Sequence, residues 1–195
     1  MSARERILDA AAEVMRTRGA AKATTKEIAR AAEYSEALLY KHFRDKEELI
    51  LCVLRERMPA PQEQVRPGEG SVAGNLTGIA RRALGYYART FPMMASMAAR
   101  PDLMAASRES MRKYGTGPQE PVVQLGAYLR AERELGRVRA EADTDAAAAL
   151  LMGACFQQGF LRYYAEGAEA PDPPESDAAA LVAPLLPGLL TRDGS

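Results

Sequence analysis

The stretch that most constrains the fold is residues 24–51, TTKEIARAAEYSEALLYKHFRDKEELIL. Thr24 and Asp45 are each followed by a glutamate three residues later, the spacing at which a capping residue and a glutamate close the start of a helix. Ser35 lies between them and is a favourable N-cap residue. The stretch therefore predicts three short helices, with only three or four residues between the first two. Two short helices joined in this way form a helix-turn-helix, whose second helix enters the major groove of DNA.

The same stretch carries a wider pattern, T-T-x-x-I-A-x-x-A-x-x-S-x-x-x-L-Y-x-x-F-x-x-K-x-x-L. The pattern is met by Thr24, Thr25, Ile28, Ala29, Ala32, Ser35, Leu39, Tyr40, Phe43, Lys46 and Leu49. On these residues the chain resembles, over about residues 4–57, the DNA-binding domain of the tetracycline-repressor (TetR) family. Three positions depart from the usual pattern. Glu33 replaces a glycine of the turn, Glu36 replaces a lysine or other non-acidic residue, and Leu38 replaces a small or hydroxyl residue.

The expected DNA contacts are of two kinds, those to phosphates and those to base edges. Residues expected to hold phosphates are Thr24, Thr25, Tyr40 and Lys46, and the resemblance supports the last three. Residues placed to read base edges are Lys26, Glu36, Ala37, Leu38 and Lys41, since lysine can donate to guanine, glutamate can accept from cytosine, and apolar groups can touch the thymine methyl. Glu36 has a second interpretation, as a charge favoured at the start of a helix. His42 is expected to pack or to face a phosphate.

Charge and composition exclude several classes of protein. The chain carries 26 basic and 26 acidic side chains, so DNA binding must come from local placement of charge. Residues 1–57 hold 12 basic and 10 acidic side chains, a small excess. The amphipathic, charged N-terminal segment does not resemble a signal peptide, and the uncharged run 146–161 is too short to cross a bilayer. We therefore expect a cytoplasmic protein that does not interact with membranes, with two free cysteines.

The remaining chain predicts helices throughout, so the expected fold class is all-α. An N-terminal three-helix DNA-binding domain with a helix-turn-helix is expected over residues 1–57, and a C-terminal helical bundle for ligand binding and dimerisation over 58–195. Apolar periodicity and helix-breaking residues place helices at about 4–17, 46–57, 72–90, 102–114, 118–135, 145–166 and 177–190. Pro92 and Pro101 are expected to bracket a short separate segment.

Methionine and aromatic side chains recur along the C-terminal half. Flexible thioethers suit adaptable apolar sites, and helical bundles hold ligands between facing helices. The predicted ligand-binding residues are Tyr86, Met93, Met97, Met104, Met111, Met152, Phe156, Gln157 and Phe160, with Arg162 as a further polar group. The alternative is an ordinary core. The TetR resemblance also implies that the helix at 145–166 and the last helix pair with their symmetry mates in a homodimer, and the less favoured alternative is an intramolecular core.

The sequence offers little for catalysis or metal binding. His42 is the only histidine, and the two cysteines are distant in the sequence, so neither a metal site nor a cofactor is expected. The most favoured function is a ligand-responsive transcriptional regulator, most simply a repressor that a small, largely apolar effector releases from a palindromic double-stranded DNA operator. One alternative is an enzyme with an all-α pocket. The other is a helical ligand-binding or interaction protein that has lost sequence-specific DNA binding, which Glu33 and Glu36 favour.

Overall fold

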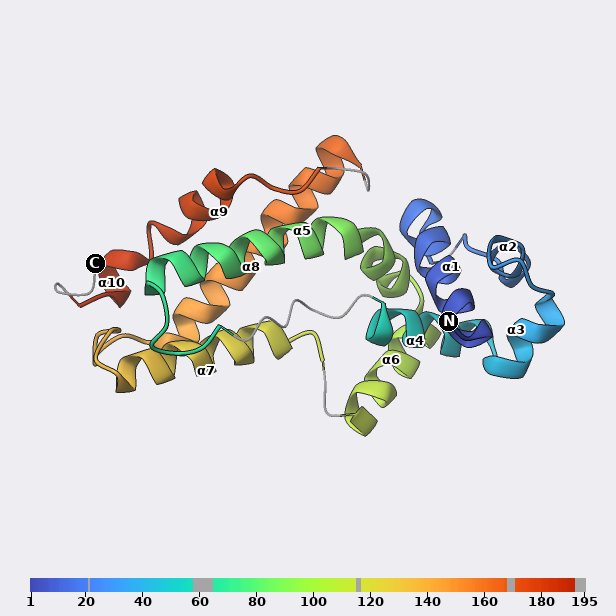
Figure 1. The fold of residues 1–195 in the computed structure, drawn as a ribbon, viewed down its shortest axis with the longest axis horizontal. Helices are drawn as coiled ribbons and strands as arrows, with labels where there is room; N and C mark the ends of the chain where they lie inside the picture. Colours follow the sequence, from blue (N-terminus) through green and yellow to red (C-terminus); the bar gives the residue numbers. More distant parts are fainter. Residues whose placement is uncertain (21, 58–64, 115–116, 168–170, 192–195) are drawn as a thin grey trace. The chain divides into compact units, whose positions relative to one another are not determined.

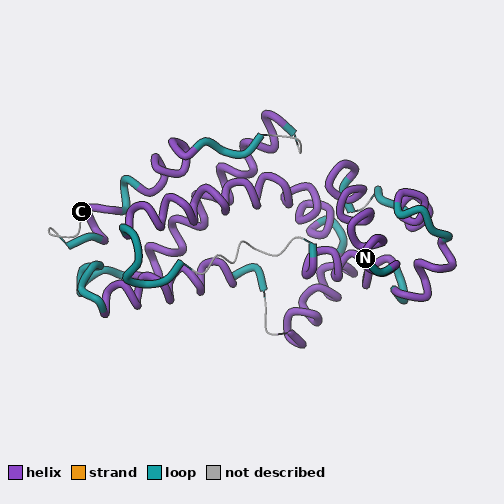
Figure 2. Tube along the Cα trace, viewed as in Figure 1, coloured by secondary structure: helices purple, strands orange, loops and turns teal. Residues whose placement is uncertain are grey.

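The computed structural model describes residues 1–20, 22–57, 65–114, 117–167 and 171–191. These residues form helices joined by loops, and the part of the chain that is described contains no strand (Figures 1 and 2). The all-α prediction is therefore confirmed. The helices are α1 (Ala3–Arg18), α2 (Thr25–Ala31), α3 (Glu36–His42), α4 (Lys46–Glu56), α5 (Val72–Ala98), α6 (Pro101–Tyr114), α7 (Glu120–Glu134), α8 (Thr144–Glu166), α9 (Glu175–Val182) and α10 (Leu186–Leu189).

The start signals seen in the sequence begin helices as predicted. The Thr24 hydroxyl accepts from the Glu27 N–H at 3.2 Å, and the Glu27 carboxylate accepts from the Thr24 N–H, which completes a capping box at α2. Ser35 caps α3 through a 3.2 Å hydrogen bond from the Leu38 N–H. Asp45 caps α4 in the same manner. Each cap satisfies a backbone donor that the first turn would otherwise leave without an acceptor.

The turn between α2 and α3 contains a left-handed residue that is not glycine. Glu33 has φ of 61°. Its N–H donates to the Arg30 carbonyl at 3.1 Å, and the Tyr34 N–H donates to the Ala29 carbonyl at 2.8 Å, which is the hydrogen-bond pattern of a Schellman motif. Glycine is preferred at this position because a Cβ strains the left-handed conformation. Glu33 therefore departs from the family pattern at a position where glycine would relieve backbone strain.

Contacts divide the chain into two compact units, and the first is discontinuous in sequence. Unit 1 comprises Met1–Pro59 and Arg89–Thr116, and unit 2 comprises Ala60–Ala88 and Gly117–Ser195. The core of unit 1 contains Ile7, Leu8 and Phe43 from the first helices together with Met93 and other residues that follow residue 88. The helix-turn-helix thus shares its hydrophobic core with a segment from the middle of the chain.

Helix α5 differs from its prediction. We expected a helix over 72–90 and a separate segment between Pro92 and Pro101, but α5 runs without interruption from Val72 to Ala98 with Pro92 inside it. Proline removes one backbone hydrogen bond from a helix, and a long helix packed on its neighbours can tolerate that loss. The residues of α5 up to 88 belong to unit 2, and those from 89 belong to unit 1.

Unit 2 is a bundle in which α7 and α9 both contact α8, and the N-terminal part of α5 packs in the same core (Figure 1). Helices α5 and α8 approach each other closely at Gly159 of α8, where an added Cβ would lie 2.6 Å from the Tyr87 Cβ and 3.1 Å from the Ala88 nitrogen. Glycine is required there because α5 leaves no space for a side chain. Leu151 is buried at 1% exposure within this core.

A buried carboxylate joins three segments at one end of unit 2. Glu132 of α7 is fully buried. One of its oxygens accepts from the Gly68 N–H at 3.2 Å, and the other lies 3.3 Å from Nε of Arg137. Arg137 also donates to the Gly70 carbonyl at 2.6 Å. The loop before α5 and the turn after α7 are thereby held together by polar contacts, which a buried charge needs if it is not to destabilise the fold.

Candidate DNA-binding surface and candidate ligand cavity

The side chains predicted to contact DNA are all accessible on α2, α3 and the start of α4. Those that are exposed are Thr24, Lys26, Ala37, Tyr40, Lys41 and His42. Those that are half-buried are Thr25, Glu36, Leu38 and Lys46. In the same region Ile28, Leu39 and Phe43 point into the core of unit 1 and fix the two helices of the motif. The local sequence therefore separates an apolar face, which holds the motif in place, from a mainly polar face, which is accessible at the surface.

Three of these side chains meet where α2 and α3 approach each other. The Thr25 hydroxyl donates a short hydrogen bond to the Glu36 carboxylate, and its oxygen lies 3.3 Å from the Tyr40 hydroxyl oxygen. Glu36 and Tyr40 are four residues apart and so share one side of α3. The Thr25 hydroxyl, which is expected to hold a phosphate, therefore lies between an acidic group and the Tyr40 hydroxyl.

The start of α4 presents positive charge in a crowded setting. Burial lowers the pKa of the Lys46 ammonium, and the positive charge of Arg100 lowers it further. The Arg100 guanidinium lies 3.6 Å from Glu47 and donates at 2.9 Å to Asp102. Arg100 precedes α6 and comes near Lys46 only because residues 89–116 fold with unit 1. The sequence does not predict this proximity, because Arg100 lies 54 positions from Lys46 along the chain.

The two arginines at the start of α1 have partners within unit 1. Arg4 donates to both carboxylate oxygens of Glu56, at 2.7 and 2.8 Å, and lies over the Phe43 ring at 5.4 Å. Arg6 pairs with Glu33 at 2.6 Å and lies over the Tyr34 ring at 5.0 Å. These contacts tie α1 to α4 and to the turn between α2 and α3. They explain the two arginines as structural residues.

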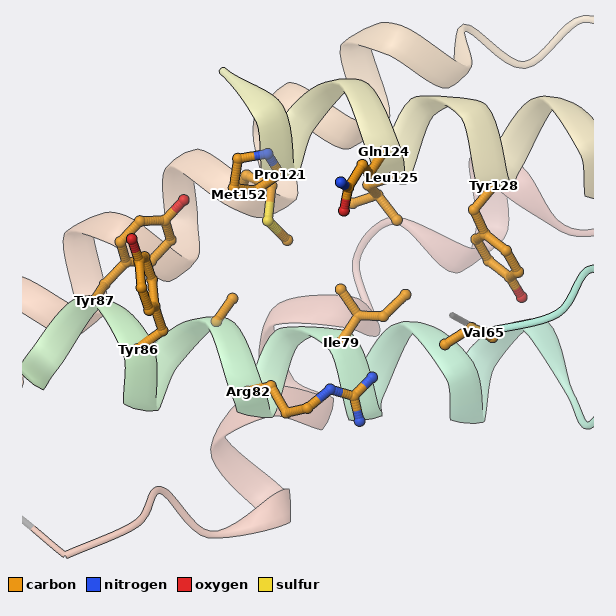
Figure 3. A pocket seen from close by; sticks show the side chains of 11 residues that line it. Val65, Ile79, Arg82, Tyr86, Tyr87, Pro121, Gln124, Leu125, Tyr128 and Met152 are labelled. Carbon is orange, nitrogen blue, oxygen red and sulfur yellow. The ribbon is translucent and has the colours of Figure 1, made fainter. Parts of the chain in front are cut away.

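Unit 2 contains a cavity of about 70 Å³ between α5, α7 and α8 (Figure 3). Figure 3 shows Gln124, Leu125 and Tyr128 pointing from α7 toward α5, where Ile79 faces them. Most of the lining is apolar, and the polar groups are few. The lining residues are Val65, Ile79, Arg82, Ala83, Tyr86, Tyr87, Pro121, Gln124, Leu125, Tyr128 and Met152. This composition is that of a small-molecule site, which is mainly apolar with a small number of placed polar groups.

Tyrosines lie at both ends of the cavity. Tyr86 and Tyr87 contact each other edge to face at one end, and Tyr128 lies at the other (Figure 3). Burial raises the pKa of Tyr87 and of Tyr128 to about 12 in each case. Both therefore stay neutral phenols at physiological pH. The Tyr128 oxygen accepts from the Asn75 amide at 2.9 Å, which fixes that hydroxyl at the edge of the cavity.

The structure brings together only part of the predicted ligand set. Tyr86 and Met152 line the cavity, whereas Met93 and Met97 are buried in the core of unit 1 with Met104 packed against that core. The side chain of Met111 lies outside the described residues.

The rest of the predicted set lies on α8. Phe156 is 43% exposed and contacts the Tyr87 ring with a centroid distance of 5.4 Å. Gln157 is exposed, and Phe160 is half-buried beside Tyr164. Arg162 pairs with Asp177 at 3.5 Å and so joins α8 to α9.

The cavity residues that the sequence analysis missed share a signal that it could have used. On α5 they recur as Ile79, Ala83 and Tyr86–Tyr87, and on α7 as Pro121, Leu125 and Tyr128. These are spacings of three to four residues, which place side chains on one face of a helix. Two such faces opposite each other predict a shared interior. Methionine content alone does not reveal this interior, because of the methionines predicted to bind ligand only Met152 lines the cavity among the described side chains.

Helix α8 also carries apolar side chains that unit 2 leaves exposed. Their exposed fractions are 64% for Leu150, 43% for Phe156, 44% for Leu161 and 81% for Tyr164. Together with exposed Gly153 and Gln157 they recur every three or four residues along the helix. We call these six residues the outer stripe of α8. A contiguous exposed apolar surface of this kind is typical of a protein interface.

Comparison with known families gives two matches that together cover most of the chain. The family described as "Bacterial regulatory proteins, tetR family" matches residues 7–53. The family described as "AefR-like transcriptional repressor, C-terminal domain" matches residues 75–183. The first match contains the helix-turn-helix, and the second contains α8 and all the cavity-lining residues except Val65. No curated protein matches the chain.

Several solved structures have the same fold at low sequence identity. A TetR-family transcriptional regulator from Mesorhizobium loti MAFF303099 is 20% identical with a TM-score of 0.73, and the alignment covers 97% of each chain. SmeT in complex with triclosan is 21% identical with a TM-score of 0.68, covering 100% of this chain and 95% of SmeT. FadR from Bacillus subtilis in complex with stearoyl-CoA is 17% identical with a TM-score of 0.66, covering 94% of this chain and 98% of FadR.

None of the described helices could span a membrane.

Proposed function

The chain belongs to the TetR family of bacterial regulators, and on that premise we propose that it is a homodimeric repressor released from a palindromic operator by a small, largely apolar effector. In this proposal residues 1–57 bind DNA and residues 58–195 bind the effector and dimerise. The observation that carries the proposal is the coexistence of an accessible polar helix-turn-helix face with a separate, mainly apolar cavity. A regulator needs both sites.

The DNA-binding part rests on α3 and on the helix starts around it. Lys26 and Lys41 are exposed and can donate to base edges or phosphates. In this proposal Thr25, Tyr40 and Lys46 hold phosphates, and the capped starts of α2 and α4 favour nearby anions. A symmetric pair of such motifs would contact half-sites about 34–36 Å apart, or multiples of that spacing.

The effector part rests on the size and lining of the cavity. Pockets for drug-sized ligands usually measure about 300–1,000 Å³, so the 70 Å³ cavity must enlarge to hold a whole ligand of that size. An effector that binds only an enlarged form has the differential affinity that it needs to shift an equilibrium between two conformations. Triclosan in SmeT and stearoyl-CoA in FadR are relatives' ligands with large apolar portions, which supports an apolar effector here.

The dimer part rests on the outer stripe of α8. Leu150, Leu161 and Tyr164 are exposed although they are apolar or aromatic, and α9 beside them exposes Ala179 and Ala180. Small and apolar residues allow two helices to pack closely, so a second copy of the chain would bury this surface. Leu151, by contrast, belongs to the intramolecular core and would not report on dimerisation.

The decisive experiment selects binding sites from a random duplex library with the purified protein. We expect a palindromic sequence, bound by a dimer, whose affinity falls steeply with salt because phosphate contacts release counterions. Lys46→Ala should weaken binding to all sequences and reduce the slope of log affinity against log salt by roughly one unit per subunit. Selection of no sequence, with dimers present in sedimentation, would contradict the proposal.

A second candidate function is supported by the acidic groups in the motif. Glu33 occupies the turn, and Glu36 is hydrogen-bonded to Thr25 among the residues expected to hold phosphates. A helical ligand-binding or interaction protein that has lost sequence-specific DNA binding would show these features. The same selection separates the two functions, since such a protein would bind an effector but enrich no DNA sequence.

A further inference from the structure

The hydrogen bond between Thr25 and Glu36 brings a negative charge into the part of the surface that would approach the DNA backbone. Glu36 is half-buried at the first position of α3, and its carboxylate accepts from the Thr25 hydroxyl of α2. The Tyr40 hydroxyl lies 3.3 Å from the same threonine oxygen. The carboxylate is thus held between the two helices by the Thr25 hydroxyl, which also lies near the Tyr40 hydroxyl, and both hydroxyl groups are suited to bind phosphate.

The two faces of α3 have different chemistry. Glu36 and Tyr40 are separated by four residues and share one side of the helix, toward α2. Ala37 and Lys41 have the same separation and lie about 100° further around the helix, where both are exposed. Base reading requires a side chain that can extend into the groove. The second pair is accessible for this, whereas the Glu36 carboxylate is already engaged with Thr25.

We propose that Glu36 lowers the affinity of this protein for DNA of any sequence, by repelling the backbone and by occupying the Thr25 hydroxyl. This inference rests on the proposed DNA-binding function. Repulsion between two like charges a few ångströms apart in water lowers a binding constant by about fivefold. A dimer carries two such groups, so the combined effect is up to about 25-fold. Because non-specific binding is almost entirely electrostatic, the residue reduces the fraction of protein held on unrelated DNA.

Two substitutions separate the charge from the hydrogen bond. Glu36→Gln removes the negative charge but keeps an oxygen that can accept from Thr25. Glu36→Ala removes both and leaves the Thr25 hydroxyl free to donate to a phosphate. The matched control is Glu13→Gln, which changes the net charge equally but alters a surface residue of α1 that pairs with Arg16. Thermal unfolding of each variant checks that the fold is retained.

The measurement is the affinity for a fluorescein-labelled, mixed-sequence 30-bp duplex by anisotropy at several salt concentrations. We expect Glu36→Gln to bind about 5- to 25-fold more tightly than the wild type, Glu36→Ala at least as tightly, and Glu13→Gln within about twofold of the wild type. Equal affinities for Glu36→Gln and Glu13→Gln would overturn the inference.

Two other outcomes have distinct meanings. Weaker binding of Glu36→Gln to a sequence selected from a random library, with unchanged binding to the mixed-sequence duplex, would make Glu36 a base reader and would also overturn the inference. If neither the wild type nor any variant binds duplex DNA at low salt, the proposed DNA-binding function itself fails, and the inference fails with it.

Discussion

The close approach of α5 and α8 at Gly159 gives the sharpest test of the packing in unit 2. Gly159→Ala would place a Cβ 2.6 Å from the Tyr87 Cβ and 3.1 Å from the Ala88 nitrogen, separations at which the two helices must move apart. Overpacking of this kind costs about 1–3 kcal/mol. The same substitution favours the helix itself by about 0.5–1 kcal/mol, because alanine has the higher helix propensity.

Helix α8 provides its own control for this substitution. Gly153 has no heavy atom within 4 Å of its added Cβ, so Gly153→Ala should gain the helix propensity alone. The propensity terms cancel between the two variants, and the difference in their free energies of unfolding isolates the clash at about 1–3 kcal/mol. Urea unfolding followed by circular dichroism measures both variants.

Equal stability of the two variants would refute the close approach at Gly159. Gly153 lies on the outer stripe of α8, so unfolding should be repeated at several protein concentrations. A destabilisation of Gly153→Ala that changes with concentration would instead report a second copy packed against that glycine.

Three further predictions concern the turn, the outer stripe and the cap of α4. Glu33→Gly should be more stable than Glu33→Ala by about 0.5–1 kcal/mol in chemical unfolding. Glycine relieves about 1–2 kcal/mol of left-handed strain, and its entropic cost is about 0.5–1 kcal/mol. Equal stabilities of the two variants would argue against the strain. The double substitution Leu161→Glu with Tyr164→Glu should shift the protein from dimer to monomer in sedimentation, whereas Val123→Glu, which alters an exposed residue on α7, should not; a dimer that survives the double change would exclude this surface. The hydrogen bond from the Glu48 N–H lowers the pKa of the Asp45 carboxyl. The stabilising effect of the charged Asp45 cap is therefore present above the unfolded pKa of about 3.9 and is lost as pH falls through the lower folded pKa. Asp45→Asn keeps a capping acceptor, and its cost measured by thermal unfolding should therefore be larger at pH 7 than at pH 3; a cost independent of pH would contradict a charged cap.

Local signals in the sequence predicted the parts of the fold that depend on local interactions. Thr24, Ser35 and Asp45 begin their helices because a capping side chain bonds to a backbone N–H only three residues away. The accessibility of the side chains predicted to contact DNA follows from the same helix positions. These contacts need no knowledge of the rest of the chain, which explains why the accessible face of the motif was predictable while its individual DNA contacts remain predictions.

Other features depend on contacts between residues far apart in sequence. Met93 and Met97 have the composition expected of a ligand site, but the packing of residues 89–116 with unit 1 makes them core. Pro92 was expected to lie beyond the end of a helix, but α5 continues past it and contains Pro92. The burial of Glu132 depends on Gly68 and Arg137, and no periodicity could reveal that combination.

The discontinuity of unit 1 has a consequence for the order of events during synthesis. Residues 7–53, which contain the helix-turn-helix, leave the ribosome first, but the core of unit 1 also contains Met93, Met97 and Leu103. At about 5–20 residues per second, the intervening stretch of about 50 residues takes roughly 2.5–10 s to make. During that interval α1 can already pack on α2 and α4, but the part of the core that Met93, Met97 and Leu103 complete, including the face of α4 that contacts α6, stays uncovered. Nascent chains arrested before Leu103 emerges should accordingly be more sensitive to protease in α1 and α4 than chains arrested after residue 116 has emerged.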